Sequence, residues 1–296
     1  MTTRARMRRG DPALGAVAAL ALGLYALFIV VPLGMSAWKS LTDENPLLAQ
    51  ANFVGLANYR DMVHDDALTS SLTFTLLLAG AVTLVANAAG IGFALLLNRT
   101  SLSFRAMRTV AFLPQVLSGV IVGFVWRYIL AQDGILNEVL VRTGIVDRPI
   151  TWLGSPLLAS FSVGLVAAWV LTGFTTVVHV AALQSIPVEL HQAAIVDGAG
   201  PWQRFRRITL PMLAPGTTIS VTISLITMLK LYDIIVALTS GGPANATQST
   251  ALYIVKLAFT DDRFGYASGV AMLLLVVSAV VALSVTGLLR RREVDL

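Results

Sequence analysis

The sequence lacks cysteine entirely and contains few charged residues. With no cysteine among its 296 residues, the chain can form neither a disulfide framework nor a thiolate metal site. Only 12% of the residues are charged, which is about half of the share usual in soluble globular proteins. This shortage of charge indicates that most of the chain is surrounded by lipid or by other apolar helices, and not by water.

The motifs of common enzymes are also missing. No glycine is followed by lysine, so the G-x-x-x-x-G-K-[ST] loop that cradles the phosphates of ATP cannot form. The hydrolase patterns G-x-S-x-G and H-E-x-x-H do not occur either. His64, His179 and His191 have no carboxylate or cysteine at ligand spacing, so no metal site is expected. The chain is therefore not expected to catalyse a covalent change, and His179, which lies in an apolar stretch, is expected to be packed and hydrogen-bonded.

Long apolar stretches dominate what remains. Hydrophobic residues make up 56% of the chain, and the mean hydropathy is +0.78. A helix needs about 20 mainly apolar residues to cross the hydrocarbon core of a bilayer, and in lipid only a helix satisfies its own backbone polar groups. The first stretch is too long for the core of a cleavable signal peptide, so we interpret it as a retained span. The sequence predicts six spanning helices, at Ala13–Trp38, Ser70–Leu97, Thr109–Leu130, Leu157–Leu183, Met212–Leu238 and Tyr266–Leu289.

The positions of the basic residues predict how these spans are oriented. Lys and Arg in short loops stay on the cytoplasmic side, whereas acidic residues carry little information. Thirteen of the 21 basic residues lie in the two ends and in alternate loops, against five acidic residues there. We therefore expect both termini and two of the loops in the cytoplasm. The basic residues in question are Arg4, Arg6, Arg8, Arg9, Arg99, Arg105, Arg108, Arg204, Arg206, Arg207, Arg290, Arg291 and Arg292.

One of these cytoplasmic loops, between the fourth and fifth stretches, has a helical pattern of its own. Pro187 suits the first turn of a helix, because its missing N–H has no partner there. Residues Val188–Val196 can form two to three turns, and Gly198 and Gly200 can end them, since glycine accepts the left-handed conformation. Pro201 then permits a second short helix that contains Trp202, Phe205 and Ile208.

The arginines of this loop, taken alone, indicate only a cytoplasmic loop, but the wider pattern is more specific. It resembles the E-A-A-x3-G-x9-I-x-L-P loop of binding-protein-dependent ABC importers, whose positions are matched by Ala193, Ala194, Gly198, Ile208, Leu210 and Pro211. Gln192 stands where that family usually has Glu. An ion pair made by the family's acid would here need Glu189 or Asp197 instead.

The resemblance implies a role for the loop. In that family it is cytoplasmic and forms a short helix that docks on a separate ATP-hydrolysing subunit, as an amphipathic helix docks in a groove. The small alanines would allow close approach. By this resemblance the coupling residues are Glu189, Gln192, Ala193, Ala194, Asp197, Gly198, Ile208, Leu210 and Pro211.

Other stretches resemble the sugar-transporting branch of the same family. Residues 53–59 are similar to an external FVGLxNY stretch, and Leu113 and Pro114, followed by Trp126, are similar to the third span. Residues 233–243 resemble the FDxxxxLTxGGP run of the maltose-type first permease subunit. The entrance to its last span is matched by Phe259, Phe264, Gly265, Tyr266 and Ala267.

The resemblance implies an all-α polytopic membrane protein with six transmembrane helices and both termini cytoplasmic. Residues 1–12 would be a basic cytoplasmic terminus, and 13–296 a single transmembrane permease domain with a coupling loop at 184–211, of which 187–211 contacts the ATPase. The expected function is that of a permease subunit in an ATP-driven importer of a sugar or related polyol, in the cytoplasmic membrane of a bacterium or archaeon. Expected partners are a second homologous permease, two ATP-binding subunits, an extracytoplasmic solute-binding protein and membrane lipid, with no nucleic acid. No cofactor is expected on this chain, because ATP and Mg would bind the partner.

Ionisable side chains inside a span suggest a solute pathway, because they are costly to place there. Lys230 and Asp233 are three residues apart, so one face of the fifth helix would carry both and they could pair. They would then either contact solute or neutralise each other while packing between helices.

Four further side chains are candidates for the pathway. Asn87 and Gln115 could hydrogen-bond a hydroxyl-rich solute or only join helices. Trp126 and Tyr232 could stack on a sugar ring or serve as interfacial anchors. The identity of the solute stays open among a disaccharide, an oligosaccharide, a polyol and glycerol phosphate.

Two other classes remain possible from the sequence. An ion-coupled secondary transporter would need internal repeats and mid-membrane carboxylates, for which Asp233 is the only support. A membrane scaffold without transport would need only the six spans. Co-purification with an ATPase chain separates the importer from both.

Overall fold

The computed structural model describes residues 12–48, 50–98 and 101–291. These residues are almost entirely helical, and the β-pairing among them is an isolated antiparallel bridge between Thr42 and Phe53. The chain divides into two compact units, residues 1–63 with 257–272 and residues 64–256 with 273–296, and each is described by itself.

The smaller unit begins with a long apolar helix. Its segments are α1 (Pro12–Tyr25), a π-helical turn η1 (Ala26–Val30) and α2 (Val31–Lys39). Residues 16–39 have the length and composition of a membrane span, and none of the most apolar part is buried by the chain itself. Another surface, of lipid or protein, must therefore cover this helix.

A pinned turn follows the first helix and includes the FVGLxNY stretch. Gly55 has a φ of +58°, a left-handed conformation that suits glycine, and α3 (Ala57–Met62) follows it. The buried Asn58 Nδ2 donates to the carbonyl oxygens of Ser40 and Thr42 at 2.8 and 2.9 Å. The stretch is thus a structural turn that joins the end of α2 to α3.

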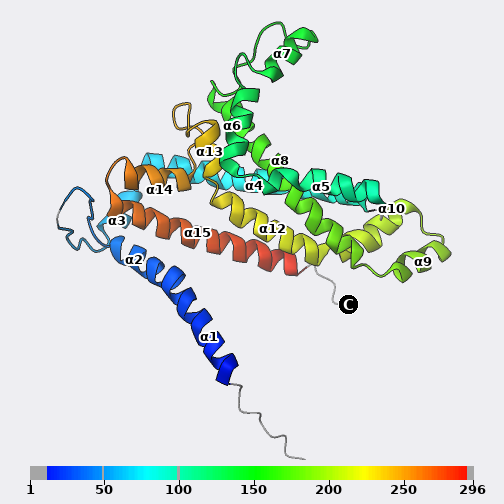
Figure 1. Ribbon diagram of the computed structural model, residues 1–296, viewed down its shortest axis with the longest axis horizontal. Helices are drawn as coiled ribbons and strands as arrows, with labels where there is room; N and C mark the ends of the chain where they lie inside the picture. The colour runs from blue at the N-terminus through cyan, green and yellow to red at the C-terminus, as the bar shows by residue number, and fades with distance from the viewer. Residues whose placement is uncertain (1–11, 49, 99–100, 292–296) are drawn as a thin grey trace, which may run out of the picture. The chain divides into compact units, whose positions relative to one another are not determined.

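The larger unit is built on α4 (Asp66–Leu97) and α8 (Pro156–Gln184), which pack against each other along their length (Figure 1). Both begin at a capping side chain: Asp65 and Ser155 accept hydrogen bonds from the N–H groups three residues later. Small residues let the backbones approach, and a Cβ on Gly90 would collide with Thr175. The fully buried positions of this core include Ala86, Val163, Val166, Ala167, Leu229 and Ile235.

Four of the six predicted spans are long single helices, and two are not. The continuous candidates are residues 16–39, 66–97, 156–184 and α15 (Phe264–Arg290). The third predicted span, Thr109–Leu130, is not one straight helix: α5 (Leu102–Val116) and α6 (Gly119–Ile129) are long and apolar enough to cross a membrane only as a pair, and they meet at 96°. Helix α5 continues for two residues after Pro114, and the bend lies at Leu117 and Ser118, whose backbones are extended.

The fifth predicted span, Met212–Leu238, is also interrupted. Helix α12 (Ala214–Leu229) ends before Lys230, and α13 (Asp233–Leu238) begins after a break. Upstream, residues 201–212 form a helix bent by 59° against α12. The break at 230–232 frees the Leu231 carbonyl, which accepts a 2.7 Å hydrogen bond from the Ser249 hydroxyl. Backbone groups released inside a membrane need such a partner.

Helices α7 and α14 are among those that fall in regions for which no span was predicted. Helix α7 (Ile135–Arg142) lies in the segment between α6 and α8. Helix α14 (Thr250–Phe259) follows the LTxGGP run and is joined to α4, because the Thr75 hydroxyl accepts from the Thr250 N–H at 2.9 Å. Both arise outside the six apolar stretches that hydropathy identifies.

Candidate functional site

The 184–211 loop contains the helices that the sequence predicts. Helix α9 spans Val188–Val196, with Pro187 as its N-cap and not within its first turn. Gly198 has a φ of +76°, its N–H donates to Ile195, and the Ala199 N–H donates to Ala194 at 2.8 Å. This double hydrogen bond is the Schellman motif, in which glycine adopts the left-handed conformation that ends a helix.

Gly200 does not end α9, contrary to expectation. Its φ of −66° is open to any residue, and it caps the next helix, α10 (Pro201–Arg204). The Gly200 N–H donates to Gln203 Oε1 at 3.1 Å. The helix continues through a π-helical turn, η2 (Phe205–Thr209), and α11 (Leu210–Met212), so Ile208, Leu210 and Pro211 form the bent entrance to α12.

The surface of α9 is open along its whole length. None of its nine residues is buried by the rest of the chain. Apolar side chains are among the exposed ones, and Val196 reaches 87% exposure. Glu189, Gln192 and Asp197 are exposed beside them, whereas Ala194 is half-buried. An exposed helix with mixed apolar and charged side chains has the character of a docking surface.

The predicted pathway residues lie at more than one helix interface. Asn87 lies between α4 and α12, where its Nδ2 donates to the Thr83 carbonyl at 2.8 Å and to Ser224 Oγ at 3.4 Å. Asn87 Oδ1, Thr83 Oγ1 and Ser220 Oγ are buried without a hydrogen-bond partner among the described residues. Thr83 and Asn87 line a groove of 480 Å³. This interface therefore has unused hydrogen-bonding capacity.

A second interface lies between α6, which follows the bend in the third span, and α13, which follows the break in the fifth. Helix α6 packs against α13, and a Cβ on Gly119 would collide with the Asp233 carboxylate. A Cβ on Gly123 would come within 2.6 Å of Ala237 Cβ. The G-x-x-x-G spacing at 119–123, a signal of close helix packing that sequence reasoning missed, explains this contact.

Lys230 and Asp233 do not share a helix face, so that prediction is wrong. Lys230 is the exposed C-cap of α12, Asp233 is the first residue of α13, and the break lies between them. Neither is in an ion pair within the described part of the chain. Asp233 Oδ1 instead accepts from the Ile234 N–H at 2.9 Å. The break therefore removes the geometry in which the two charges would neutralise each other.

The other three candidates have ordinary packing contacts. Trp126 of α6 meets Trp169 edge to face, with ring centroids 5.5 Å apart. Tyr232 is half-buried against the core, and Gln115 is half-buried in the last turn of α5. His179 is buried as expected and donates from Nδ1 to the Thr175 carbonyl at 2.7 Å. This contact makes His179 a packed residue of α8.

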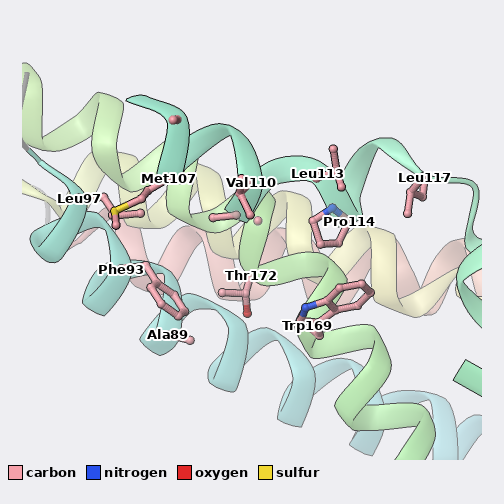
Figure 2. A pocket seen from close by; sticks show the side chains of 13 residues that line it. Ala89, Phe93, Leu97, Met107, Val110, Leu113, Pro114, Leu117, Trp169 and Thr172 are labelled. Carbon is pink, nitrogen blue, oxygen red and sulfur yellow. The ribbon is translucent and has the colours of Figure 1, made fainter. Parts of the chain in front are cut away.

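A large apolar groove lies beside these helices. It measures 810 Å³ and is lined from α4, α5 and α8, with Phe93, Val110, Pro114 and Trp169 around it (Figure 2). Thr172 adds the one hydroxyl among the lining side chains. A groove with so few polar groups suits lipid chains or an apolar helix and is unsuited to a hydroxyl-rich solute.

The 239–250 segment, which begins at the threonine of the LTxGGP run, contains many hydrogen bonds between its own polar groups. Thr239 and Thr247 share a hydrogen bond of 2.8 Å between their hydroxyls, and Thr247 Oγ1 donates to the Gly242 carbonyl at 2.7 Å. Residues Thr247–Thr250 are all buried. Through Ser249, whose hydroxyl donates to the Leu231 carbonyl, the segment is hydrogen-bonded to the break between α12 and α13.

Comparisons with known proteins agree with these features. Residues 86–294 match the family described as binding-protein-dependent transport system inner membrane component. The chain is 31% identical to a probable starch degradation products transport system permease protein of Thermoanaerobacterium thermosulfurigenes, with 91% of each chain covered. It is 30% identical to the trehalose/maltose transport system permease protein of Thermococcus litoralis, over 91% of this chain and 92% of that one.

A solved structure has the same fold over nearly the whole chain. It is the crystal structure of a bacterial alginate ABC transporter in complex with an alginate pentasaccharide-bound periplasmic protein. The TM-score is 0.81 at 25% identity, with 95% of each chain covered. Since the family match covers more than half of the sequence, including the 184–211 loop, the chain belongs to the inner membrane components of binding-protein-dependent transport systems.

Proposed function

We propose that this chain is a permease subunit that imports a sugar or a related polyol, driven by ATP hydrolysis on a separate subunit. The two relatives above are named for starch degradation products and for trehalose and maltose, and the similar solved transporter for alginate. All of these are carbohydrates. The proposal carries their solute class over to this chain.

The exposed α9 helix is the observation that supports the proposal most directly. None of its residues is buried within the part of the chain that the structure describes, and the left-handed Gly198 ends the helix before α10. Burying a side chain such as Val196 against a partner would contribute about 1.5 kcal/mol or more. We infer that an ATP-binding subunit supplies that cover in the cytoplasm.

Each coupling residue then has a role. The small side chains of Ala193 and Ala194 let the partner approach closely, and Glu189, Gln192 and Asp197 orient the contact through hydrogen bonds. Gly198 sets the turn. The helical segment η2–α11 leads directly into α12, so it would transmit movement of the loop to that span. It contains Ile208, Leu210 and Pro211.

The solute pathway is proposed along the two interfaces that carry polar groups. Asn87 offers a buried oxygen that has no partner among the residues the structure describes, so it is the best placed to hydrogen-bond a hydroxyl. Lys230 and Asp233 lie at the α12–α13 break, and Tyr232 and Gln115 lie beside such breaks. Trp126 would have to leave Trp169 to stack on a sugar ring.

The chain works with other subunits in this proposal. A second homologous permease completes the pathway, two ATP-binding subunits bind from the cytoplasm with ATP and Mg, and an extracytoplasmic binding protein delivers the solute. Among the described residues no group of three or more His, Cys, Asp or Glu is placed to hold a metal. Closure of the ATP-binding pair would move the 184–211 loop and tilt the spans, giving alternating access.

Reconstitution in vesicles tests the proposal. The chain would be purified alone and together with its second permease, ATP-binding subunits and binding protein, and uptake of a panel of labelled saccharides measured with and without ATP. We expect uptake only from the full assembly with ATP. Uptake by the single chain, driven by a proton or sodium gradient, would instead establish a secondary transporter. A full assembly that hydrolyses ATP without moving any solute would leave a scaffold role.

A further inference from the structure

The loop between α8 and α12 contains two parts of opposite charge. Residues 184–200, which include α9, contain Glu189 and Asp197 but neither lysine nor arginine. Residues 201–212, from the start of α10 to the end of α11, contain three arginines and no acidic residue. We name residues 201–212 the basic segment. Because a surface selects partners of complementary charge, the two parts of the loop are suited to different partners.

The exposed side of the basic segment combines aromatic, basic and apolar side chains. Trp202, Arg206 and Leu210 follow one another at four-residue intervals, which places them on one side of a helix. Trp202 is 69% exposed and Leu210 is 44% exposed, and Arg206 is exposed between them. Ile208 is half-buried and Thr209 is buried. One side of the segment is therefore packed within the chain, and the side that carries the indole is open.

The indole of Trp202 is held at this open surface by a neighbouring ring. Its centroid lies 5.5 Å from that of Phe205, with an angle of 30° between the two rings, and Phe205 is half-buried. Tryptophan is enriched where a membrane meets water, because its ring is apolar and its N–H is polar. An exposed indole at the end of a membrane span therefore indicates contact with the headgroup region of the lipid.

Arg206 and Arg207 supply positive charge beside the indole. Both are exposed, and neither is in an ion pair within the described part of the chain. No acidic residue occurs from Gly198 to Tyr232, so no near neighbour in the sequence neutralises them. The cytoplasmic leaflet has a negative surface potential, which attracts clusters of this kind. Arginine also binds phosphate through two parallel hydrogen bonds, so it suits a phospholipid headgroup.

The bend before α12 turns the basic segment toward the membrane surface. Residues 201–212 are bent by 59° against α12, and the two helices together are long and apolar enough for a span. When α12 crosses the bilayer, the segment is therefore inclined toward the plane of the headgroups. Figure 1 shows α10 beyond the end of α12, at the same end of the unit as α9. Amphipathic helices that bind membranes lie in this plane, with one face against the lipid.

We propose that the basic segment binds the headgroups of anionic phospholipids in the cytoplasmic leaflet. Arg206 and Arg207 contact the phosphates, and Trp202 lies at the level of the headgroups. This inference rests on the proposed function for the cytoplasmic position of the loop. The loop then has two partners: the ATP-binding subunit covers α9, and lipid covers the basic segment that leads into α12.

Lipid proximity tests the inference, and the absence of cysteine from the natural chain makes a single label possible. Gln203→Cys, at an exposed position beside Trp202, would carry a fluorophore in the complete transporter, in nanodiscs of phosphatidylcholine. Phosphatidylglycerol or phosphatidylcholine with a nitroxide near the headgroup would be added as a quencher. We expect phosphatidylglycerol to quench at a concentration lower by about fivefold or more, since each basic residue near a membrane favours anionic lipid by about that factor.

Matched variants separate the charge of the segment from the charge of the whole cytoplasmic side. Arg206→Gln combined with Arg207→Gln should reduce the preference for phosphatidylglycerol to within about twofold, because it removes both charges. Arg206→Lys combined with Arg207→Lys keeps the charges and should retain most of the preference. Arg290→Gln combined with Arg291→Gln removes two exposed arginines at the end of α15 and should leave the preference unchanged.

Three results would overturn the inference. Equal quenching by the two lipids would show that the segment does not recognise an anionic headgroup. An equal loss of preference in the variant at Arg290 and Arg291 would assign the preference to the overall charge of the protein. A lack of quenching by either lipid would show that protein covers the segment, and loss of the ATP-binding subunit from the glutamine variant at Arg206 and Arg207 would identify that protein.

This inference and the proposed function can fail separately. Quenching is measured without ATP or solute, so an assembly that carries no saccharide can still show a preference for anionic lipid. If the natural assembly takes up a saccharide with ATP but is quenched equally by both lipids, only this inference fails.

Discussion

Helix α9 and the 239–250 segment differ in how their side chains are satisfied. Both are short, and each is close to a glycine at a positive φ: Gly198 follows α9, and Gly241 lies within the 239–250 segment. Yet α9 has no buried residue, whereas four consecutive polar residues of the 239–250 segment, Thr247–Thr250, are buried. One region leaves its apolar surface open, and the other uses its polar groups within the chain.

This difference indicates whether each region is stabilised by contacts within the chain or only by contacts with a partner. The hydroxyls of Thr239, Thr247 and Ser249 bond to neighbours in the same unit, so that segment stabilises the fold by itself. The apolar side chains of α9 gain nothing until a partner covers them. Substitutions in the first region should change stability, and substitutions in the second should change assembly.

The largest effect is expected at Gly198. Gly198→Val forces a branched side chain into φ +76°, at a cost of about 1–2 kcal/mol, although nothing in the chain lies within 4 Å of a Cβ there. We expect insertion in the membrane but no uptake, measured by vesicle transport and membrane fractionation. Gly200→Ala is the matched control, because Gly200 is equally open but has φ −66°. Normal transport by Gly198→Val would remove the turn from the coupling mechanism.

Ser249→Ala should destabilise the 239–250 segment, whose polar groups hydrogen-bond within the chain. It removes the donor to Leu231 and the acceptor for the Leu252 N–H. A buried group left without its partner costs about 1–3 kcal/mol, so the melting temperature of the purified chain should fall, while transport per folded molecule persists. Thr227→Ala, which removes an exposed hydroxyl, should leave the melting temperature unchanged. An unaltered melting temperature for Ser249→Ala would contradict the comparison.

Val196→Asp should have the opposite effect, weakening assembly with a partner without lowering the stability of the chain. This side chain is 87% exposed and contributes nothing to the isolated fold, but it would lose about 1.5 kcal/mol of burial against a partner, or about tenfold in affinity. Co-purification of the ATP-binding subunit should fall while the melting temperature of the chain stays the same. Val196→Ile keeps the apolar surface and should retain the partner. A lower melting temperature with full retention would refute the docking role.

The smallest effect is expected for Gln192→Glu. The side chain is exposed and makes no hydrogen bond with another described residue, and restoring the usual acid of the family adds a surface charge worth at most about 1 kcal/mol. ATP-driven uptake should change by less than about fivefold. A much larger loss would show that the partner has adapted to the neutral amide.

The sequence predicted helix α9 more accurately than the spans around it. The bounds Val188–Val196 and the turn at Gly198 follow from local chemistry, because proline and glycine restrict the backbone wherever they stand. Hydropathy also located four spans. It missed the breaks in the third and fifth because apolar composition continues across them: the chain bends at the extended residues Leu117 and Ser118 in one, and the contact between Ser249 and Leu231 satisfies the other.

The pathway candidates were predicted less well, for a related reason. Lys230 and Asp233 look paired on a helical repeat, but the pairing depends on an intact helix that the fold interrupts. The G-x-x-x-G spacing of Gly119 and Gly123 indicates close helix packing, and the sequence analysis did not use it. The role of Asn137 had no local signal, since its five hydrogen bonds form only when residues 131–132 and 150–152 come together around it.

By itself, the sequence determined that the chain is a helical membrane protein with a short helix and a glycine turn in the loop at 184–211, because hydropathy and the proline and glycine positions act through nearest neighbours. Only the tertiary structure decided where the helices break and which polar groups are left without partners among the described residues. Each of these depends on contacts between residues far apart in the chain, and no local pattern records which distant group will satisfy a buried hydrogen bond.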